Sequence, residues 1–361
     1  MQKGKNCLSM GVLLLLMAVT AGLLLRDQPL SRLAGVLSHI RGGYAALGLL
    51  LMLAFVGCEA LCSRLILARL GHKTPYRRCL GYSFAGFYFS SITPSATGGQ
   101  PAQVYYMSKD GIPAAHGALN MMLIAVCYQV TVIGYALAVL VFRSDLLANL
   151  GTGLGALLLF GGGVNLALTA GMLGLMFAPN AVRRLMEGVL GLGVRLRLVK
   201  DPAAARERLE RQVEEYRQGA ECLRRNLSLV PALAGLTVVQ LTALFAVPYV
   251  VYLAFGLSGY GPMDVICTQA LVTLAVSSLP LPGAVGASEG GFVAAMTLFF
   301  GAGLVTPAVL VSRGISFYAF LLVSGGVTLY MHMRSRRKDA VSPRPNPAPK
   351  RVRGAVTNSF S

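Results

Sequence analysis

The chain has 361 residues, of which 55% are hydrophobic and only 13% are charged, whereas a soluble domain carries roughly 25% charged residues. Its formal net charge is +18 at pH 7. Anionic lipid at a membrane surface balances such a surplus, so nucleic acid is not an expected partner. The composition excludes an ordinary soluble enzyme and predicts an all-α integral membrane protein.

Stretches of about 20 apolar residues predict the helices that span the membrane. The first stretch follows Lys3 and Lys5, and because no convincing small-residue cleavage site precedes Arg26, it is interpreted as an uncleaved helix rather than a signal peptide. With three shorter or interrupted stretches, the sequence predicts about eight spans. The clear stretches are 8–25, 44–67, 117–142, 153–177, 229–255 and 308–332, and the less clear ones are 79–92, 265–279 and 292–305.

Lysine and arginine collect in three regions, at 64–78, 183–225 and 334–353. Positive charge next to membrane spans is retained on the cytoplasmic side, so these regions and both termini are expected in the cytoplasm. An even number of crossings must then separate the three regions. Residues 79–109 are therefore predicted to form a hairpin that enters and leaves the membrane on the cytoplasmic side.

The expected domain organisation is one polytopic membrane domain over residues 1–332, followed by a disordered, basic and proline-rich cytoplasmic tail over 333–361. The long polar loop 180–228 is predicted to contain an amphipathic helix. Its apolar positions recur at spacings of three or four and are Leu209, Val213, Tyr216, Ala220 and Leu223. This helix is interpreted either as a connector along the inner membrane surface or as a sensor of lipid headgroups.

Two segments combine Ser-Ser, proline and glycine: SSITPSATGGQPAQ from Ser90 and SSLPLPGAVGASEGG from Ser277. Non-helical backbone is tolerated at membrane depth only where protein buries it or where it lines a wet cavity. Broken helices at corresponding positions of two halves indicate a transport site, because their ends offer free N–H and C=O groups. Glycines are expected where a side chain would block close backbone approach or where the backbone angle is unusual. These are Gly98, Gly99, Gly283 and Gly286.

Three ionisable residues lie in apolar surroundings: Glu59 in the second span, Glu289 in the second broken segment and Arg313 in the last span. Such groups are costly in a membrane, so they are functional candidates that need partners. A Glu289–Arg313 pair could meet the phosphate and a cationic substituent of a lipid headgroup, or could merely fix the last helix. For Glu59 a structural role near the interface is favoured, because Arg64 follows one and a half turns later.

Enzyme chemistry finds no support in the sequence. It has no Ser/His/Asp set, no glycine-rich phosphate loop before a soluble helix, and no Cys/His cluster at metal-ligand spacing. We therefore expect no catalytic residue, no cofactor and no bound metal.

The stretches PSATGGQPAQVYYMSKDGIP and LPLPGAVGASEGGF, with the polar loop between them, resemble the transmembrane region of the lysylphosphatidylglycerol synthase family. This region is the flippase-like part of bacterial multiple peptide resistance factor proteins, and the resemblance covers about residues 8–332. It implies a lipid translocase of the bacterial inner membrane, linked to antibiotic resistance, that moves aminoacylated phosphatidylglycerol or another polar-headgroup lipid. Pro101 and Gly290 also match the motifs. The substrate-binding residues implied, with the charged pair, are Pro94, Ser95, Thr97, Gly98, Gly99, Gln100, Gln103, Pro282, Gly283, Gly286, Ser288, Glu289 and Arg313.

One departure from the family pattern shapes the expected activity. Full-length members carry a soluble synthase domain after the membrane region, whereas this sequence continues for only about 30 residues beyond the last predicted span, too few for a domain of order 100 residues. Translocation is therefore expected rather than lipid synthesis, with a phospholipid substrate and anionic inner-leaflet lipids as partners. Two other hypotheses stay open: a membrane component that works with a separate lipid-modifying transferase, and a regulatory protein without transport. The headgroup, the energy source and homo-oligomer formation are also open.

Overall fold

Helices make up the described part of the protein, in which no strand occurs. The predicted all-α class is confirmed for these residues. The predicted first span at 8–25 lies outside them, as does the predicted tail 333–361 beyond residue 341. Residues 333–341, predicted to belong to the disordered tail, are instead part of the helix that ends at Val341. The computed structural model describes residues 42–144, 152–177, 179–195, 202–226, 228–279 and 281–341.

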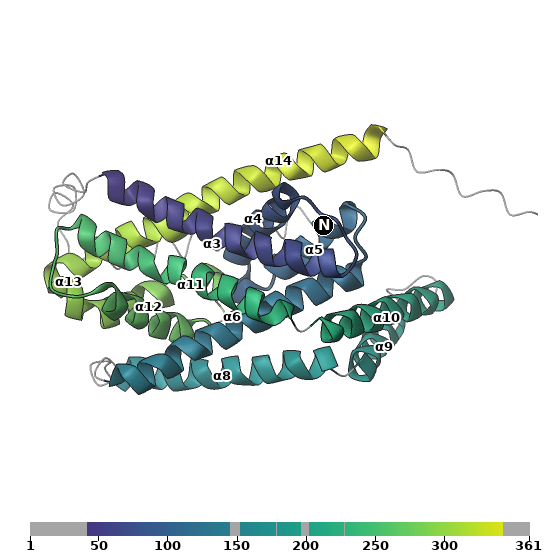
Figure 1. Cartoon of the computed structure of the whole chain (residues 1–361), viewed down its shortest axis with the longest axis horizontal. Coiled ribbons are helices and arrows are strands. Elements are labelled where there is room, and N and C mark those ends of the chain that lie inside the picture. The colour runs from purple at the N-terminus through teal and green to yellow at the C-terminus, as the bar shows by residue number, and fades with distance from the viewer. Residues whose placement is uncertain are drawn as a thin grey trace, which may run out of the picture.

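The long apolar helices run along the longest axis of the molecule (Figure 1). Within the described residues, 5 segments are long and apolar enough to cross a membrane. Their outward faces carry exposed leucine, valine and phenylalanine side chains, as contact with lipid tails requires. These segments are α3 (Gly42–Arg69), α6 (Ala114–Phe142), α8 (Thr152–Phe177), α11 (Leu229–Ala254), and the long segment Ala287–Arg334.

The last of these segments is built from three elements: α13 (Ala287–Arg313), the π-helical turn η3 (Gly314–Ala319) and α14 (Phe320–Val341). The sequence predicts two spans here, 292–305 and 308–332. The structure instead interrupts α13 at Gly301, whose φ of 69° and ψ of 163° are not helical. Arg313 is the last residue of α13, directly before the π-helical turn.

Two shorter helix–turn–helix hairpins complete the bundle. The first is α4 (Tyr76–Ile92), the 3-10 turn η1 (Pro94–Ala96) and α5 (Gly99–Lys109), and it corresponds to the predicted hairpin at 79–109. The second is α12 (Pro262–Val276), the 3-10 turn η2 (Pro282–Ala284) and the start of α13. The two turns contact each other, so segments far apart in sequence meet at their tips.

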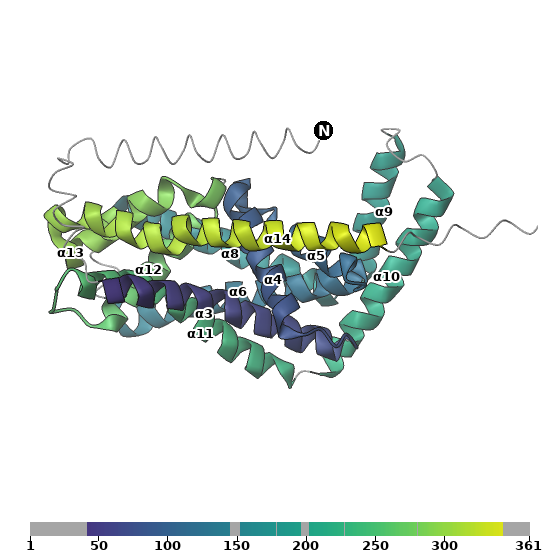
Figure 2. The same ribbon diagram turned by 90° about the horizontal axis from the view of Figure 1, so that it is seen from above.

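Two amphipathic helices, α9 (Pro179–Arg195) and α10 (Pro202–Arg225), lie across one end of the bundle (Figure 2). The α10 helix covers the region predicted from the apolar spacing, whereas α9 was not anticipated. Tyr216, Ala220 and Leu223 of α10 are buried in one cluster with residues of α3 and α6. This part of the apolar face of α10 therefore contributes to the protein core.

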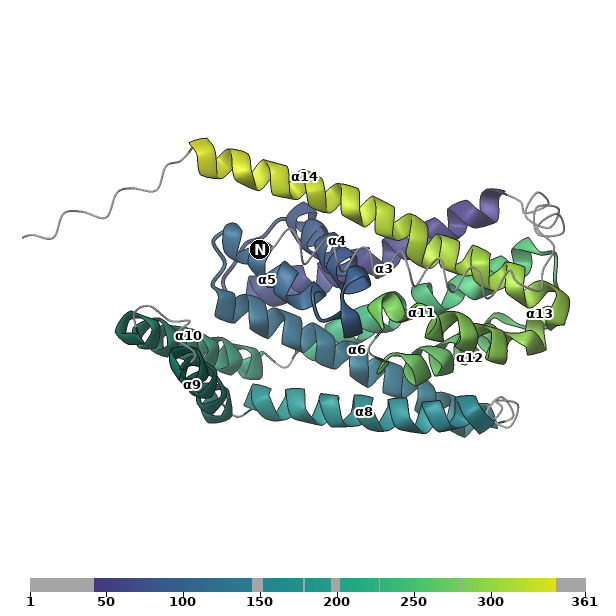
Figure 3. The same cartoon turned by 180° about the vertical axis from the view of Figure 1, so that it is seen from behind.

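The two hairpins occupy opposite ends of the bundle. Figures 1 and 3 show α5 toward the end that carries α9 and α10, and show α12 and α13 toward the other end. The contact between η1 and η2 thus lies between the two hairpins, at the inner end of each. This arrangement brings both Ser-Ser, proline and glycine motifs to one place.

Candidate functional site

The two turns repeat one unusual backbone conformation. Ser95 and Ala96 in η1 have φ values of 51° and 54°, and Gly283 and Ala284 in η2 have values of 58° and 51°. Positive φ is uncommon for residues other than glycine. Because each turn contains two consecutive residues with positive φ, the two turns have the same backbone geometry. The equivalence pairs Pro94 with Pro282.

Side chains next to each turn satisfy its backbone groups. In the first turn, the Gly98 N–H donates to Thr93 Oγ1 at 2.9 Å, and the Thr97 hydroxyl donates to the Pro94 carbonyl oxygen at 2.9 Å. In the second, the Gly286 N–H donates to Glu289 Oε2 at 2.7 Å. Backbone that leaves the helical path away from water needs such partners, which explains why polar residues flank the turns.

The four glycines singled out from the sequence have the predicted physical roles. A Cβ on Gly99 would lie 2.0 Å from Ser90 Oγ and 2.7 Å from the carbonyl oxygen of Gly86. One on Gly98 would lie 2.6 Å from a methyl carbon of the Thr93 side chain. Gly283 and Gly286 adopt positive φ, of 58° and 88°. The prediction of close approach or unusual backbone angles is confirmed.

The predicted Glu289–Arg313 ion pair is present. Arg313 Nε donates to Glu289 Oε1 at 2.8 Å, and Arg313 Nη2 donates to the Gly283 carbonyl oxygen at 3.0 Å. The Glu289 side chain is 2% exposed and that of Arg313 is 15% exposed. The guanidinium carbon lies 4.4 Å from the centre of the Phe317 ring. The pair therefore fastens the end of α13 to the second turn.

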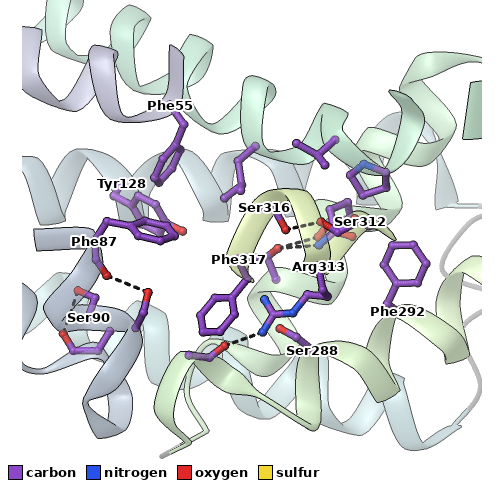
Figure 4. A pocket seen from close by; sticks show the side chains of 18 residues that line it. Phe55, Phe87, Ser90, Tyr128, Ser288, Phe292, Ser312, Arg313, Ser316 and Phe317 are labelled. Carbon is purple, nitrogen blue, oxygen red and sulfur yellow. Dashed lines mark hydrogen bonds between the residues drawn. The ribbon is translucent and has the colours of Figure 1, made fainter. Parts of the chain in front are cut away.

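Two adjoining cavities open beside the meeting turns. The larger has a volume of about 590 Å³ and the smaller, shown in Figure 4, about 300 Å³. Both lie within or near the range of roughly 300–1,000 Å³ that is usual for ligand pockets. Figure 4 shows Arg313 between Phe317 and Ser288. The residues that line both cavities are Phe55, Phe87, Ser90, Ala96, Tyr128 and Gly283.

The site residues predicted from the sequence divide into three groups. Those that line the larger cavity are Ser95, Gly99, Gln100, Gln103 and Gly283. Those that line the smaller one are Gly283, Ser288 and Arg313, with Glu289 bonded to Arg313. Those placed in or beside the turns, and not among the described residues that line either cavity, are Pro94, Thr97, Gly98 and Gly286. Pro282 begins the second turn.

Glu59 is the main correction to the sequence interpretation. It lines the larger cavity, and its Oε1 accepts a hydrogen bond from Gln103 Nε2 at 2.9 Å. No ion pair joins it to Arg64 among the described residues. Glu59 is thus a cavity residue, whereas the sequence favoured a structural role near the interface.

Asn165 of α8 is a cavity residue that the sequence reasoning missed. It is 2% exposed, and its Nδ2 donates to Ser277 Oγ at 2.9 Å and to the Gly161 carbonyl oxygen at 2.7 Å. It therefore holds the Ser-Ser pair of the second motif against α8. The sequence does contain a clue to this role, because Asn165 is the one amide side chain within the predicted span 153–177. Such side chains usually form hydrogen bonds with neighbouring helices.

Comparison with known proteins assigns a family. A family model described as "Lysylphosphatidylglycerol synthase TM region" matches residues 7–324. The matched range includes both hairpins, both cavities and Arg313. No curated protein matches the chain.

Proposed function

Because the chain belongs to the lysylphosphatidylglycerol synthase transmembrane-region family, we propose that it translocates a phospholipid with a polar headgroup between the leaflets of the bacterial inner membrane. Membership ties this multi-pass membrane protein to lysylphosphatidylglycerol metabolism or translocation. The observation that carries the proposal is the meeting of two hairpin turns beside two cavities, the smaller of which is lined by Arg313 of the Glu289–Arg313 ion pair. A lipid headgroup needs such a polar path through the hydrocarbon region.

The lengths of the hairpin helices support a re-entrant arrangement. A span needs about 20 residues to cross the hydrocarbon core, whereas α4 has 17 residues and α12 has 15. Each helix therefore ends inside the membrane when its outer end is at the surface. In the proposed arrangement one hairpin enters from the side of α9 and α10 and the other from the opposite side, so that the two turns meet within the membrane beside the cavities.

Arg313 supplies the chemistry for a lipid phosphate. A guanidinium carries five N–H donors. Within the described residues, Arg313 donates one hydrogen bond to Glu289 and one to the Gly283 carbonyl oxygen. Donors that remain can bind phosphate oxygens, which form strong charge-assisted hydrogen bonds with arginine. Because Glu289 balances the guanidinium charge while the site is empty, Arg313 can stay charged at this depth.

The orientation of the membrane domain is tested by chemical labelling. We expect the basic regions to be cytoplasmic, so Lys73→Cys and Arg206→Cys should react with a membrane-impermeant thiol reagent only after cells are opened. Tyr260→Cys, at an exposed position between α11 and α12, should react in intact cells. The parent protein, with its native cysteines alone, is the control for background labelling. Reaction of Arg206→Cys in intact cells would overturn the orientation.

The proposed activity is tested in cells by leaflet-resolved lipid analysis, with and without the gene. We expect loss of the protein to lower the outer-leaflet share of a polar-headgroup phospholipid while its total amount stays constant. A fall in the total amount at an unchanged leaflet ratio would instead assign the protein to lipid synthesis with a separate transferase. No change in either quantity would contradict translocation.

A further inference from the structure

One carboxyl group in the larger cavity takes no part in the proposed binding of lipid phosphate. Glu59 of α3 lines this cavity and accepts a hydrogen bond from Gln103 Nε2 of α5 at 2.9 Å. Its other polar neighbours are Ser83 of α4 and Gln240 of α11. All three neighbours are neutral side chains that do not titrate, so none of them compensates a negative charge on Glu59.

The titratable groups that face Glu59 from the described residues supply no positive charge either. They are Tyr128 of α6 and Cys62 of α3 itself, which are uncharged near pH 7. Arg313, in the adjoining cavity, is paired with Glu289, and no ion pair within the described ranges involves Glu59. An unpaired carboxylate at membrane depth is costly, and binding a proton removes its charge.

Gln103 has an acceptor that a protonated Glu59 would satisfy. Its Oε1 is buried without a hydrogen-bond partner, while its Nε2 donates to Glu59 Oε1. A carboxylate only accepts hydrogen bonds, whereas a protonated carboxyl group also donates one. With a proton on Oε2, Glu59 can donate to Gln103 Oε1 and still accept from Gln103 Nε2. This acid–amide ring removes the cost of the unpaired buried oxygen.

The cavity supplies a route by which the proton can leave. Glu59 is partly exposed to a space of about 590 Å³, which is large enough for several water molecules. When Glu59 gives up its proton, the O–H bond breaks, the electron pair stays on the carboxylate, and the proton passes to a cavity water. The hydroxyl of the neighbouring Ser83 can then donate to the carboxylate. Polar side chains from other elements that line the same route are Gln100, Gln129, Asn165 and Ser278.

The state of Glu59 bears directly on the first hairpin. The hydrogen bond to Gln103 joins α3 to α5, and α5 follows the turn η1 that contacts η2. The Gln103 side chain also fits closely against α4, since a Cβ on Gly86 would lie 2.1 Å from its Nε2. Loss of the proton removes one of the two hydrogen bonds in the acid–amide ring, so it loosens the hold of α3 on this hairpin. Proton binding and the position of the first turn are thereby linked.

We propose that Glu59 is a proton-binding site whose protonation is coupled to lipid translocation, so that a proton gradient drives the transport. The inference rests on the proposed function and names its energy source. Gln103 is a positioning residue that holds the protonated acid. Arg313 keeps its separate role toward the lipid phosphate in the smaller cavity.

The test follows lipid redistribution in vesicles that contain the purified protein and a phosphatidylethanolamine labelled on its acyl chain. The outer pH is constant, the inner pH is varied, and potassium with valinomycin holds the membrane potential at zero. A brief pulse of an impermeant amine reagent reports the share of lipid in the outer leaflet. If one proton moves with each lipid, the steady-state ratio between leaflets should change about tenfold for each unit of pH difference. Reversing the gradient should reverse the change.

Glu59→Gln should make the leaflet ratio independent of the gradient, because an amide can take the place of the protonated acid but cannot release a proton. Glu59→Asp keeps a titratable carboxyl group and should restore part of the response. Glu214→Gln is the matched control, since it also removes one carboxylate. Glu214 lies on α10, where hydrogen bonds from Arg217 and Gln218 hold the pKa of its carboxyl at about 2. This control should respond to the gradient as the wild type does.

Infrared spectra recorded over a range of pH detect the proton site without any transport. A protonated carboxyl group has a C=O stretching band that a carboxylate lacks. We expect wild-type protein in nanodiscs to lose one such band as the pH rises, and we expect this band to be absent from Glu59→Gln. In Gln103→Leu the band should shift in frequency, because the acid O–H has lost its acceptor. This second variant carries the test if Glu59→Gln does not fold.

Three outcomes would overturn the inference. The first is a wild-type protein that moves the lipid to a leaflet ratio indifferent to the gradient, and the second is an unchanged response in Glu59→Gln. The third is a titrating infrared band that persists unaltered in both Glu59→Gln and Gln103→Leu, which would assign the proton to another group. Failure of the proposed function gives a different result, because wild-type vesicles would then redistribute no lipid with or without a gradient.

Discussion

Replacement of Arg313 by glutamine is expected to abolish lipid translocation and to lower the free energy of unfolding by about 3–5 kcal/mol, the usual effect of breaking a buried pair. The change leaves Glu289, with a 2% exposed side chain, without its cation. It also removes the donor to the Gly283 carbonyl oxygen. Glu289→Gln should act in the same direction. Thermal unfolding in detergent and translocation in vesicles measure the two effects.

The double variant Glu289→Gln, Arg313→Gln separates a binding role from a structural one. Without either charge, stability should recover, because replacing a buried pair by neutral groups is often tolerated. Translocation should stay absent, since no cation remains for the lipid phosphate. Full recovery of translocation would show that the pair only fixes the last helix, and the site would then move to Gln100, Gln103 and the backbone around Pro94.

Gly99→Ala is expected to stop translocation and to destabilise the protein by about 1–3 kcal/mol, the range for overpacking. The new methyl would meet Ser90 Oγ and also the Gly86 carbonyl oxygen, at 2.7 Å. Because the second obstacle is backbone, α4 and α5 must separate and the first turn must shift. Transport in vesicles and the amount of protein in the membrane are the two measurements.

Gly290→Ala provides the matched control for this change. Gly290 belongs to the second motif, yet a Cβ there would meet nothing within 4 Å. It should therefore transport normally. Gly286→Ala should also stop translocation, but for a different reason. The φ of Gly286 is 88°, and this backbone angle is strained for any residue other than glycine. Normal transport by Gly99→Ala and Gly286→Ala at normal expression would exclude the turns from the site.

Several long apolar helices could be predicted from the sequence because they depend on local composition. Residues 44–67, 117–142 and 229–255 fall within a few residues of α3, α6 and α11, since long apolar runs have few alternatives in a membrane. The break at Gly301 could not be predicted in the same way. Glycine is common in membrane helices, and only packing decides which one leaves the helical path.

The contacts of the candidate site could be predicted only where both partners stand out in the sequence. Glu289 and Arg313 stand out as charges in apolar sequence, but the place of Glu59 depends on a hydrogen bond that joins α3 to α5. The nearness of Arg64 in sequence was weak support for an interfacial role of Glu59, because residues five apart on an α-helix point roughly 140° away from each other. Gln103 belongs to a motif, yet nothing local shows that its amide bonds to Glu59.

Reconstitution of the purified protein in lipid vesicles tests the central claim most directly. Vesicles contain a fluorescent phosphatidylethanolamine labelled on its acyl chain so that the amine is free, and its exposure in the outer leaflet is followed with an impermeant reagent that modifies the amine. We expect that wild-type protein makes inner-leaflet lipid reactive, whereas the double variant Glu289→Gln, Arg313→Gln leaves vesicles indistinguishable from protein-free ones. Equal reactivity in wild-type and protein-free vesicles would contradict lipid translocation by this protein.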